Sequence, residues 1–183
     1  MTVKEIIYLA ATELGIKTEV ESHIEKNATN GAKNAQLLLH CYNTVERELG
    51  LDYFPLNATE SLYTSTGKIM FFSFSKAVTQ IVKIQKENGE EQACEMFAGY
   101  LLTDPGTLHI FYRYAPEEKG FSDSSDVNVV VSKNMLTYGV VAAFALASGR
   151  YQEWEIWDQK YKESIKAAYQ MQSANRMQSR RWV

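Results

Sequence analysis

The stretch ATESLYTSTGKIMFFSF, residues 58–74, differs in pattern from the sequence on either side of it. It is rich in aromatic and β-branched residues, which favour strands, and Ser-Thr-Gly interrupts it with residues typical of a tight turn. The runs AVTQIVKIQ and EQACEMF flank KENGE in the same way, and TLHIFYRY follows TDPG. This alternation of strand and turn patterns predicts an antiparallel sheet of about five strands.

Helices are predicted on the N-terminal side of this β-rich segment. Thr2 and Glu5 have the spacing of a capping box at the start of a first helix, and Thr18 begins a second helix in the same way. Apolar residues then recur at every third or fourth position over residues 33–49, and Gly50 ends the run. The N-terminal quarter of the chain is therefore predicted to be helical.

Two further helices are predicted on the C-terminal side. Ser132 is a suitable cap for the first of them. On the second, Trp154, Trp157, Tyr161 and Ile165 recur at intervals of three or four residues and so share one stripe. This continuity favours a structural core over the alternative, in which the two tryptophans form a platform that stacks on a ligand.

These patterns together predict an α+β fold with a single domain. The helices of residues 1–50 and 131–172 are expected to pack together as a helical bundle, with an antiparallel sheet of about five strands, residues 57–115, inserted between them. The domain is expected to span residues 1–174, and residues 175–183 are expected to form an extended C-terminal tail.

Two segments carry expectations about exposure. The polar segment EEKGFSDSSD, residues 117–126, is rich in acids and turn-forming residues, so we expect an exposed and mobile loop. The aromatic run FFSF, residues 71–74, is expected in the core, and the alternative is an exposed aromatic hairpin at a contact between subunits.

Length and composition indicate a folded globular protein. The chain has 183 residues, of which 45% are hydrophobic and 22% charged, and a disordered chain would have fewer apolar residues. The start of the sequence lacks the features of a signal peptide, and no run of 18 apolar residues follows. We therefore expect a protein without membrane spans that stays in the cytoplasm where it is made, with Cys41 and Cys94 as free thiols.

Charge is distributed unevenly along the chain. The formal net charge is −3, yet the residues from Gln159 onward carry six bases and one acid, which leaves −8 on the rest. The last nine residues, NRMQSRRWV, contain three arginines and a tryptophan but no acid. Arg and Trp are favoured at interfaces, so we expect a tail that orders on a partner rather than a disordered, solubilising end. The residues of this docking tail are Arg176, Met177, Arg180, Arg181, Trp182 and Val183.

Local motifs of catalysis do not occur in the sequence. It has no GxSxG elbow, GxxxxGK[ST] phosphate loop, HExxH motif or GxGxxG turn. The three histidines fall in separate predicted elements without carboxylates or cysteines at ligand spacing. We therefore predict no enzymatic activity, no cofactor and no metal site.

The C-terminal sequence AAFALASGRYQEWEIWDQKYKESIKAAYQMQSANRMQSRRWV, together with the order of helices and strand-rich insert, resembles the small head–tail connector proteins of tailed bacteriophages, also called adaptor or head completion proteins. The matching features are the alanine-rich helix that closes at Gly149, the motif WDQKY and the terminal RRW. The resemblance is strongest over the last 50 residues or so and looser over the N-terminal helices.

The resemblance implies a structural protein of the virion, located at the head–tail interface after assembly in the host cytoplasm. Such a protein forms a homo-oligomeric ring, expected to be a dodecamer, under the portal protein. The ring lines the DNA channel, through which DNA passes without sequence-specific binding, and joins the capsid vertex to the next neck or tail protein. The resemblance also implies that the C-terminal tail reaches the portal.

Other functions remain open from the sequence. A nucleic-acid-binding module could use Lys160, Lys162, Lys166 and the tail arginines on phosphates, with Trp182 stacked on a base. The sequence pI of about 5.7 argues against such a module, because these proteins carry a broad basic surface. Another tail component, such as a tail terminator, and an uncharacterised hydrolase are further alternatives.

Overall fold

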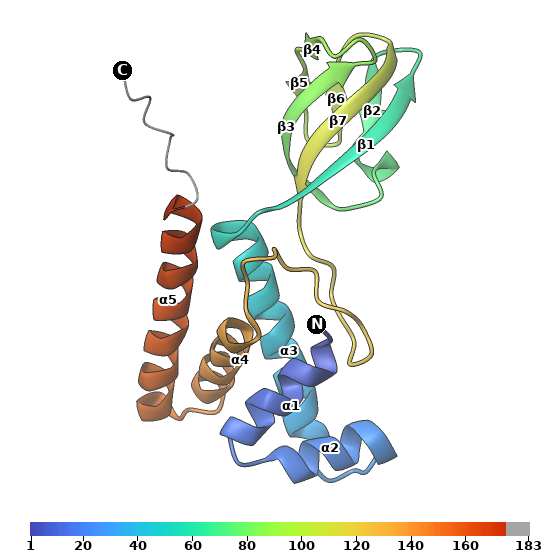
Figure 1. Cartoon of the computed structure of the whole chain (residues 1–183). Coiled ribbons are helices and arrows are strands. Elements are labelled where there is room, and N and C mark those ends of the chain that lie inside the picture. The colour runs from blue at the N-terminus through green and yellow to red at the C-terminus, as the bar shows by residue number, and fades with distance from the viewer. Residues whose placement is uncertain (175–183) are drawn as a thin grey trace, which may run out of the picture. The chain divides into compact units, whose positions relative to one another are not determined.

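The computed structural model describes residues 1–174, and it has the predicted α+β fold. Two compact units make up the chain: a helical unit, formed by residues 1–48 and the chain from 118 onward, and a sheet unit, Leu49–Glu117. Figure 1 shows the helices and the sheets in these separate parts of the chain. The sequence patterns were interpreted as one domain with an insert, whereas the insert forms a compact unit of its own.

Five α-helices form the described part of the helical unit. They are α1 (Val3–Glu13), α2 (Lys17–Lys26), α3 (Ala32–Glu48), α4 (Lys133–Ala147) and α5 (Tyr151–Ala174). Helix α4 contacts α1, α3 and α5, whereas α2 packs on α1 and α3. Most residues of α4 are buried, as expected for a helix covered on several sides.

Local capping signals explain where several helices begin. The Thr2 hydroxyl accepts a hydrogen bond from the backbone N–H three residues later (3.3 Å), and the Ser132 hydroxyl does the same (3.1 Å). Both predicted caps are thereby confirmed. The predicted cap at Thr18 is wrong, because α2 begins one residue earlier, at Lys17, and Thr18 lies within its first turn.

A glycine allows three helices to approach closely in the helical unit. A Cβ atom on Gly139 of α4 would lie 2.7 Å from Val45 Cγ1 of α3 and 2.9 Å from Tyr161 Cε2 of α5. These distances are well below van der Waals contact, so no larger residue fits without a shift of the neighbouring side chains. The packing of α3, α4 and α5 therefore depends on a residue without a side chain.

Two antiparallel sheets form the sheet unit, within the part of the chain that the structure describes. The four-stranded sheet has the order β1-β7-β3-β4, and the three-stranded sheet has the order β2-β6-β5. The strands are β1 (Leu56–Thr64), β2 (Lys68–Met70), β3 (Val78–Lys86), β4 (Glu91–Gln92), β5 (Glu95–Met96), β6 (Tyr100–Leu102) and β7 (Gly106–Tyr114).

The prediction of one sheet with about five strands is wrong, because the segment divides into two sheets. A 3-10 turn, Phe71–Ser73, ends β2 after three residues, and β2 pairs with β6 instead of forming a hairpin ladder with β1. The predicted hairpin around KENGE is confirmed, since β3 pairs with β4 at Ile84 and Gln92. The turn-forming residues thus predicted one local hairpin correctly, but they did not predict which strands the short strands pair with.

The core of the sheet unit contains residues from both sheets, and the Phe74 ring packs edge-on against Tyr112 with centroids 5.0 Å apart. Phe72, in contrast, is 82% exposed. A 3-10 turn rotates by about 120° per residue, so neighbouring aromatics cannot all face the core. The expectation that FFSF is a core segment therefore holds for Phe74 and fails for Phe72. The buried cluster is Ile69, Phe74, Ile84, Leu101, Leu108, Ile110 and Tyr112.

Candidate functional site

The predicted core stripe of α5 is buried at only two of its four positions. Tyr161 and Ile165 are each 5% exposed, whereas Trp154 and Trp157 are half-buried. The two tryptophans were expected in the core, and the structure corrects this. Helix α5 packs mainly on α4, so one neighbouring helix covers only the centre of a wide aromatic stripe.

Trp157 belongs to a half-exposed aromatic and basic cluster. Its ring centroid lies 5.7 Å from that of Tyr138 on α4, and Lys160 Nζ lies 4.0 Å from the Trp157 ring centroid. On the same helix, Lys162 Nζ forms an ion pair with Asp158 Oδ2 at 2.6 Å. Two lysines of the hypothetical phosphate-binding strip are therefore engaged by neighbours on α5.

The predicted docking tail lies outside the described residues. This applies to each of its members, and their role remains a prediction: Arg176, Met177, Arg180, Arg181, Trp182 and Val183.

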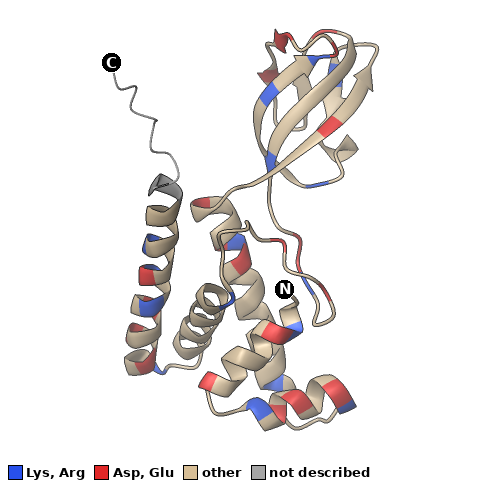
Figure 2. Cartoon of the chain, in the orientation of Figure 1, with Lys and Arg blue, Asp and Glu red and all other residues tan. Residues whose placement is uncertain are grey.

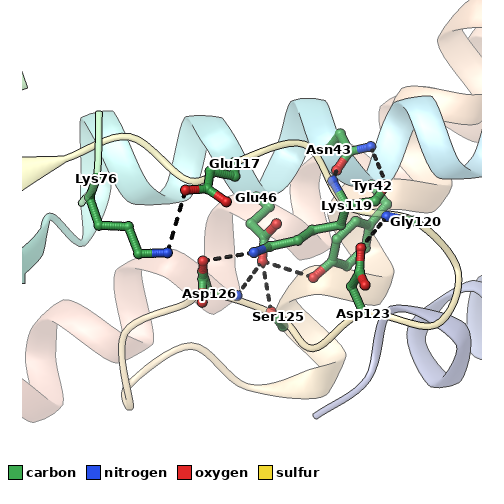
Figure 3. Close-up of polar contacts among 10 residues, drawn as sticks. All are labelled: Tyr42, Asn43, Glu46, Lys76, Glu117, Lys119, Gly120, Asp123, Ser125 and Asp126. Atoms are coloured by element: carbon green, nitrogen blue, oxygen red, sulfur yellow. Dashed lines mark hydrogen bonds and ion pairs between the residues drawn. The ribbon is translucent and has the colours of Figure 1, made fainter. Parts of the chain in front are cut away.

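A buried carboxylate connects α3 with the loop that follows the sheet unit (Figure 3). Glu46 is 1% exposed, and its Oε1 atom accepts hydrogen bonds from the Tyr42 hydroxyl (2.9 Å), the Ser125 hydroxyl (3.0 Å) and the Asp126 N–H (2.7 Å). Its Oε2 atom is buried and has no hydrogen-bond partner among the described residues. All three donors therefore converge on one oxygen of a fully buried side chain.

A second group of polar contacts holds the same loop in place. The Asn43 side chain donates to the Lys119 carbonyl (3.0 Å) and accepts from the Lys119 N–H (2.8 Å), while Lys119 Nζ pairs with Asp126 Oδ2 at 2.7 Å. The backbone of Asp123 accepts a hydrogen bond from the Val3 N–H at 3.0 Å. The expectation of an exposed loop holds for about half of its residues, Glu117, Glu118 and residues 122–124, but the loop is also anchored by these contacts to α3 and to the start of α1.

The surroundings of Glu46 set the direction of its pKa shift. Burial raises the pKa of the carboxyl group, because the charged form loses its hydration. Hydrogen bonds from Tyr42, Asp126 and Ser125 and the charge of Lys119 oppose this effect without cancelling it. We call the contacts of Glu46, Asn43, Lys119, Ser125 and Asp126 the loop clamp.

The sheet unit carries an exposed apolar surface, which we call the outer apolar face and define as Met70, Phe97, Tyr100 and Leu102. Leu101 of β6 is fully buried, so its neighbours Tyr100 and Leu102 point to the opposite side of the three-stranded sheet. The Phe97 ring stacks on Tyr100 with centroids 4.8 Å apart, and Phe97 and Leu102 remain 42% and 41% exposed. A cluster of this kind is typical of a contact surface.

Acidic residues gather around β4 and β5 (Figure 2), and β5 pairs with β6 of this face. A shallow groove of about 320 Å³ lies there, and Glu95, Leu102 and Asp104 are among the residues that line it. The sequence from residue 87 to residue 104 contains five acids and no lysine or arginine. We call these acids the acidic rim: Glu87, Glu90, Glu91, Glu95 and Asp104.

Sequence reasoning missed both the loop clamp and the outer apolar face. The signal for Glu46 was present, since it follows Tyr42 by four residues and therefore lies on the buried side of α3. An acid on an apolar stripe indicates a buried polar contact. The outer apolar face had no comparable signal, because strands of two or three residues are too short to show a period.

Within residues 1–174, His, Cys, Asp and Glu side chains do not converge in groups of three that could hold a metal ion. None of the helices described there combines the length and the apolar character that crossing a membrane requires.

Comparison of the chain with models of protein families gave no match, and comparison with curated proteins gave none either.

Proposed function

We propose that this protein is a head–tail connector of a tailed bacteriophage, a structural protein that forms a ring under the portal. The observation that carries the proposal is the resemblance over residues 142–183. The alanine-rich part of that sequence lies on α4, Gly149 follows with a φ of 72°, and the WDQKY motif lies on α5. Two of the three matching features thus lie on consecutive helices, and the terminal RRW lies outside the described residues.

A ring of identical copies requires two unlike contact surfaces on each copy, and this chain offers two candidates. In a closed ring, one surface of each copy meets a different surface of the next. The helical unit offers the half-exposed aromatic and basic cluster at Trp157, while the sheet unit offers the outer apolar face with its acidic rim. In the proposed ring, the N-terminal and C-terminal helices pack as a bundle that forms the body of each copy.

The charge distribution suits a channel that DNA crosses. Lysine and arginine would hold the duplex by binding its phosphates, whereas an acidic body repels them and favours passage. The residues before Gln159 carry a formal net charge of −8, which has the same sign as the phosphates of DNA. The basic residues of the C-terminal tail then serve a protein partner, which we propose to be the portal.

Truncation tests the proposal. Removal of residues 176–183 from the protein made during infection should leave a folded protein that fails to attach to filled heads, because the tail supplies the portal contact. Particle yield and DNA retention are the measurements, and Glu19→Lys on the surface of α2 is a matched control. Intact, DNA-retaining particles at normal yield from the truncated protein would contradict the role of the tail.

A further inference from the structure

The outer apolar face is unusual because its exposed side chains lie beside charges that have no counterion. Lys86 pairs with Asp104 at 3.3 Å, and Lys68 Nζ lies 4.0 Å from the Tyr100 ring centroid. In the part of the chain that the structure describes, no ion pair neutralises the four glutamates of the acidic rim. The surface therefore combines exposed apolar area with uncompensated negative charge.

A ligand for this surface must be basic and must also carry large apolar side chains. Arginine suits the rim, because its guanidinium group can bind a carboxylate through two hydrogen bonds. An aromatic side chain suits the groove beside Leu102, where it would cover apolar area that is now exposed. The partner is thus expected to be a short segment with arginines and an aromatic residue.

This chain contains such a segment outside the described residues. Residues 175–183 combine Arg176, Arg180 and Arg181 with Met177 and Trp182, and they contain no acid. We propose that the outer apolar face and its acidic rim form the docking site for residues 175–183 of a second copy of this chain. Three positive side chains meet four unpaired glutamates, and the two large apolar side chains meet the outer apolar face.

The inference rests on the proposed function, which makes this chain a self-associating protein whose tail later engages the portal. It adds two surfaces that meet while the tail is free of the portal. The portal and a second copy then compete for the same nine residues, so the contact belongs to the free protein before the tail engages the portal.

Reciprocal charge reversal tests the contact in the full-length protein without portal. One variant reverses the rim through Glu90→Lys, Glu91→Lys and Glu95→Lys, and the other reverses the tail through Arg180→Glu and Arg181→Glu. Sedimentation velocity at low salt, over a range of protein concentrations, measures self-association. The wild-type protein should associate, and each variant alone should associate at least tenfold more weakly, because like charges then meet.

Mixing the two variants provides the decisive arm. The wild-type tail of the first variant meets the wild-type rim of the second, and the two reversed segments are also complementary, so association should return. Raising the salt concentration should weaken it. The control variant Glu19→Lys with Glu21→Lys changes exposed acids of α2 and should associate like the wild type. Circular dichroism confirms that each variant is folded.

Several results would overturn the inference. These are a wild-type protein that stays monomeric at all concentrations at low salt, variants that associate as the wild type does, and a mixture that stays monomeric. Chemical crosslinking provides a further check. A crosslink between the acidic rim and the tail that forms equally at every dilution would show a contact within one chain, and would also overturn the inference. Attachment to heads is scored separately, so a failed contact between copies leaves the proposed function intact.

Discussion

The helical unit holds a buried glutamate, Glu46, and the sheet unit holds a half-buried one, Glu60, and the hydrogen bonds to the two carboxylates differ. In the sheet unit, the Ser75 N–H donates to both oxygens of Glu60 at 3.2 Å, and the hydroxyls of Ser75 and Tyr112 donate to Oε1. In the helical unit, all three donors reach one oxygen of Glu46. The other oxygen of Glu46 is buried without a hydrogen bond among the described residues.

The pKa shifts of the two carboxyl groups therefore have opposite signs. Burial raises the pKa of Glu60, but the hydrogen bonds from Ser75 and Tyr112 outweigh it, so the net pKa lies below the ordinary value. For Glu46, burial dominates and the net pKa lies above the ordinary value. The charged form of Glu60 is therefore favoured, because it is only half-buried and both of its oxygens accept hydrogen bonds, whereas burial of Glu46 carries a cost that its role in holding the loop must offset.

The largest effect is expected from removing the buried carboxylate. Glu46→Ala leaves the Tyr42 hydroxyl, the Ser125 hydroxyl and the Asp126 N–H without their acceptor, and should lower the free energy of unfolding by about 3 kcal/mol. Glu60→Ala should cost only about 1 kcal/mol, because its site is nearer the surface and water can replace the carboxylate. Urea denaturation measures the free energy of unfolding of both variants. Equal losses would contradict the claim that the two carboxylates differ.

Close packing provides a second comparison between the units. Gly139→Ala should lower the free energy of unfolding by about 2 kcal/mol, because the new methyl group would overlap Val45 and Tyr161. Gly99 in the sheet unit has open space around its Cβ position and no left-handed backbone angle, so Gly99→Ala should change stability by less than about 0.5 kcal/mol. Thermal melts of the two variants test this, and a stable Gly139→Ala protein would show that the three helices can separate slightly.

Removal of an exposed or half-exposed aromatic ring should change stability less than the preceding substitutions, and the two units should differ less. Trp157→Ala removes a half-buried ring together with its contacts to Tyr138 and Lys160, and should cost about 1 kcal/mol. Phe72 in the sheet unit is 82% exposed, so Phe72→Ala should change stability by less than about 0.5 kcal/mol. A loss of about 3 kcal/mol or more for Trp157→Ala would instead place this ring in the core, as the sequence pattern predicted.

The smallest effects are pH-dependent and have opposite signs. Because the folded-state pKa of Glu46 is raised, this group contributes stability below its ordinary value of 4.5 and loses the contribution as pH rises through the raised pKa. Glu60 contributes stability above 4.5 and loses it as pH falls through the lowered pKa.

Glutamine variants isolate these contributions, since glutamine does not titrate. As pH falls, the stability of the wild type should rise relative to Glu46→Gln and fall relative to Glu60→Gln. Urea denaturation at a series of pH values measures both differences. Slopes of the same sign for the two variants would show that the surroundings of the two carboxylates do not act as the hydrogen bonds indicate.

The features that the sequence predicted correctly are local ones. The Thr2 and Ser132 caps join residues three positions apart, and the β3–β4 hairpin is specified by the turn residues between the strands. The bonds from Ser125 and Asp126 to Glu46 span about 80 residues, and the pairing of β2 with β6 spans about 30. Sequence periodicity carries no information on such partners, so the loop clamp and the division into two sheets were not predicted.

Cryo-electron microscopy of the intact virion tests the central proposal most directly. We expect a ring of copies of this chain between the portal and the next neck or tail protein, with the helical and sheet units recognisable in each copy and residues 176–183 in contact with the portal. DNA should pass through the ring without ordered contacts to bases. Absence of this chain from the head–tail interface, or its presence elsewhere in the particle, would contradict the proposal.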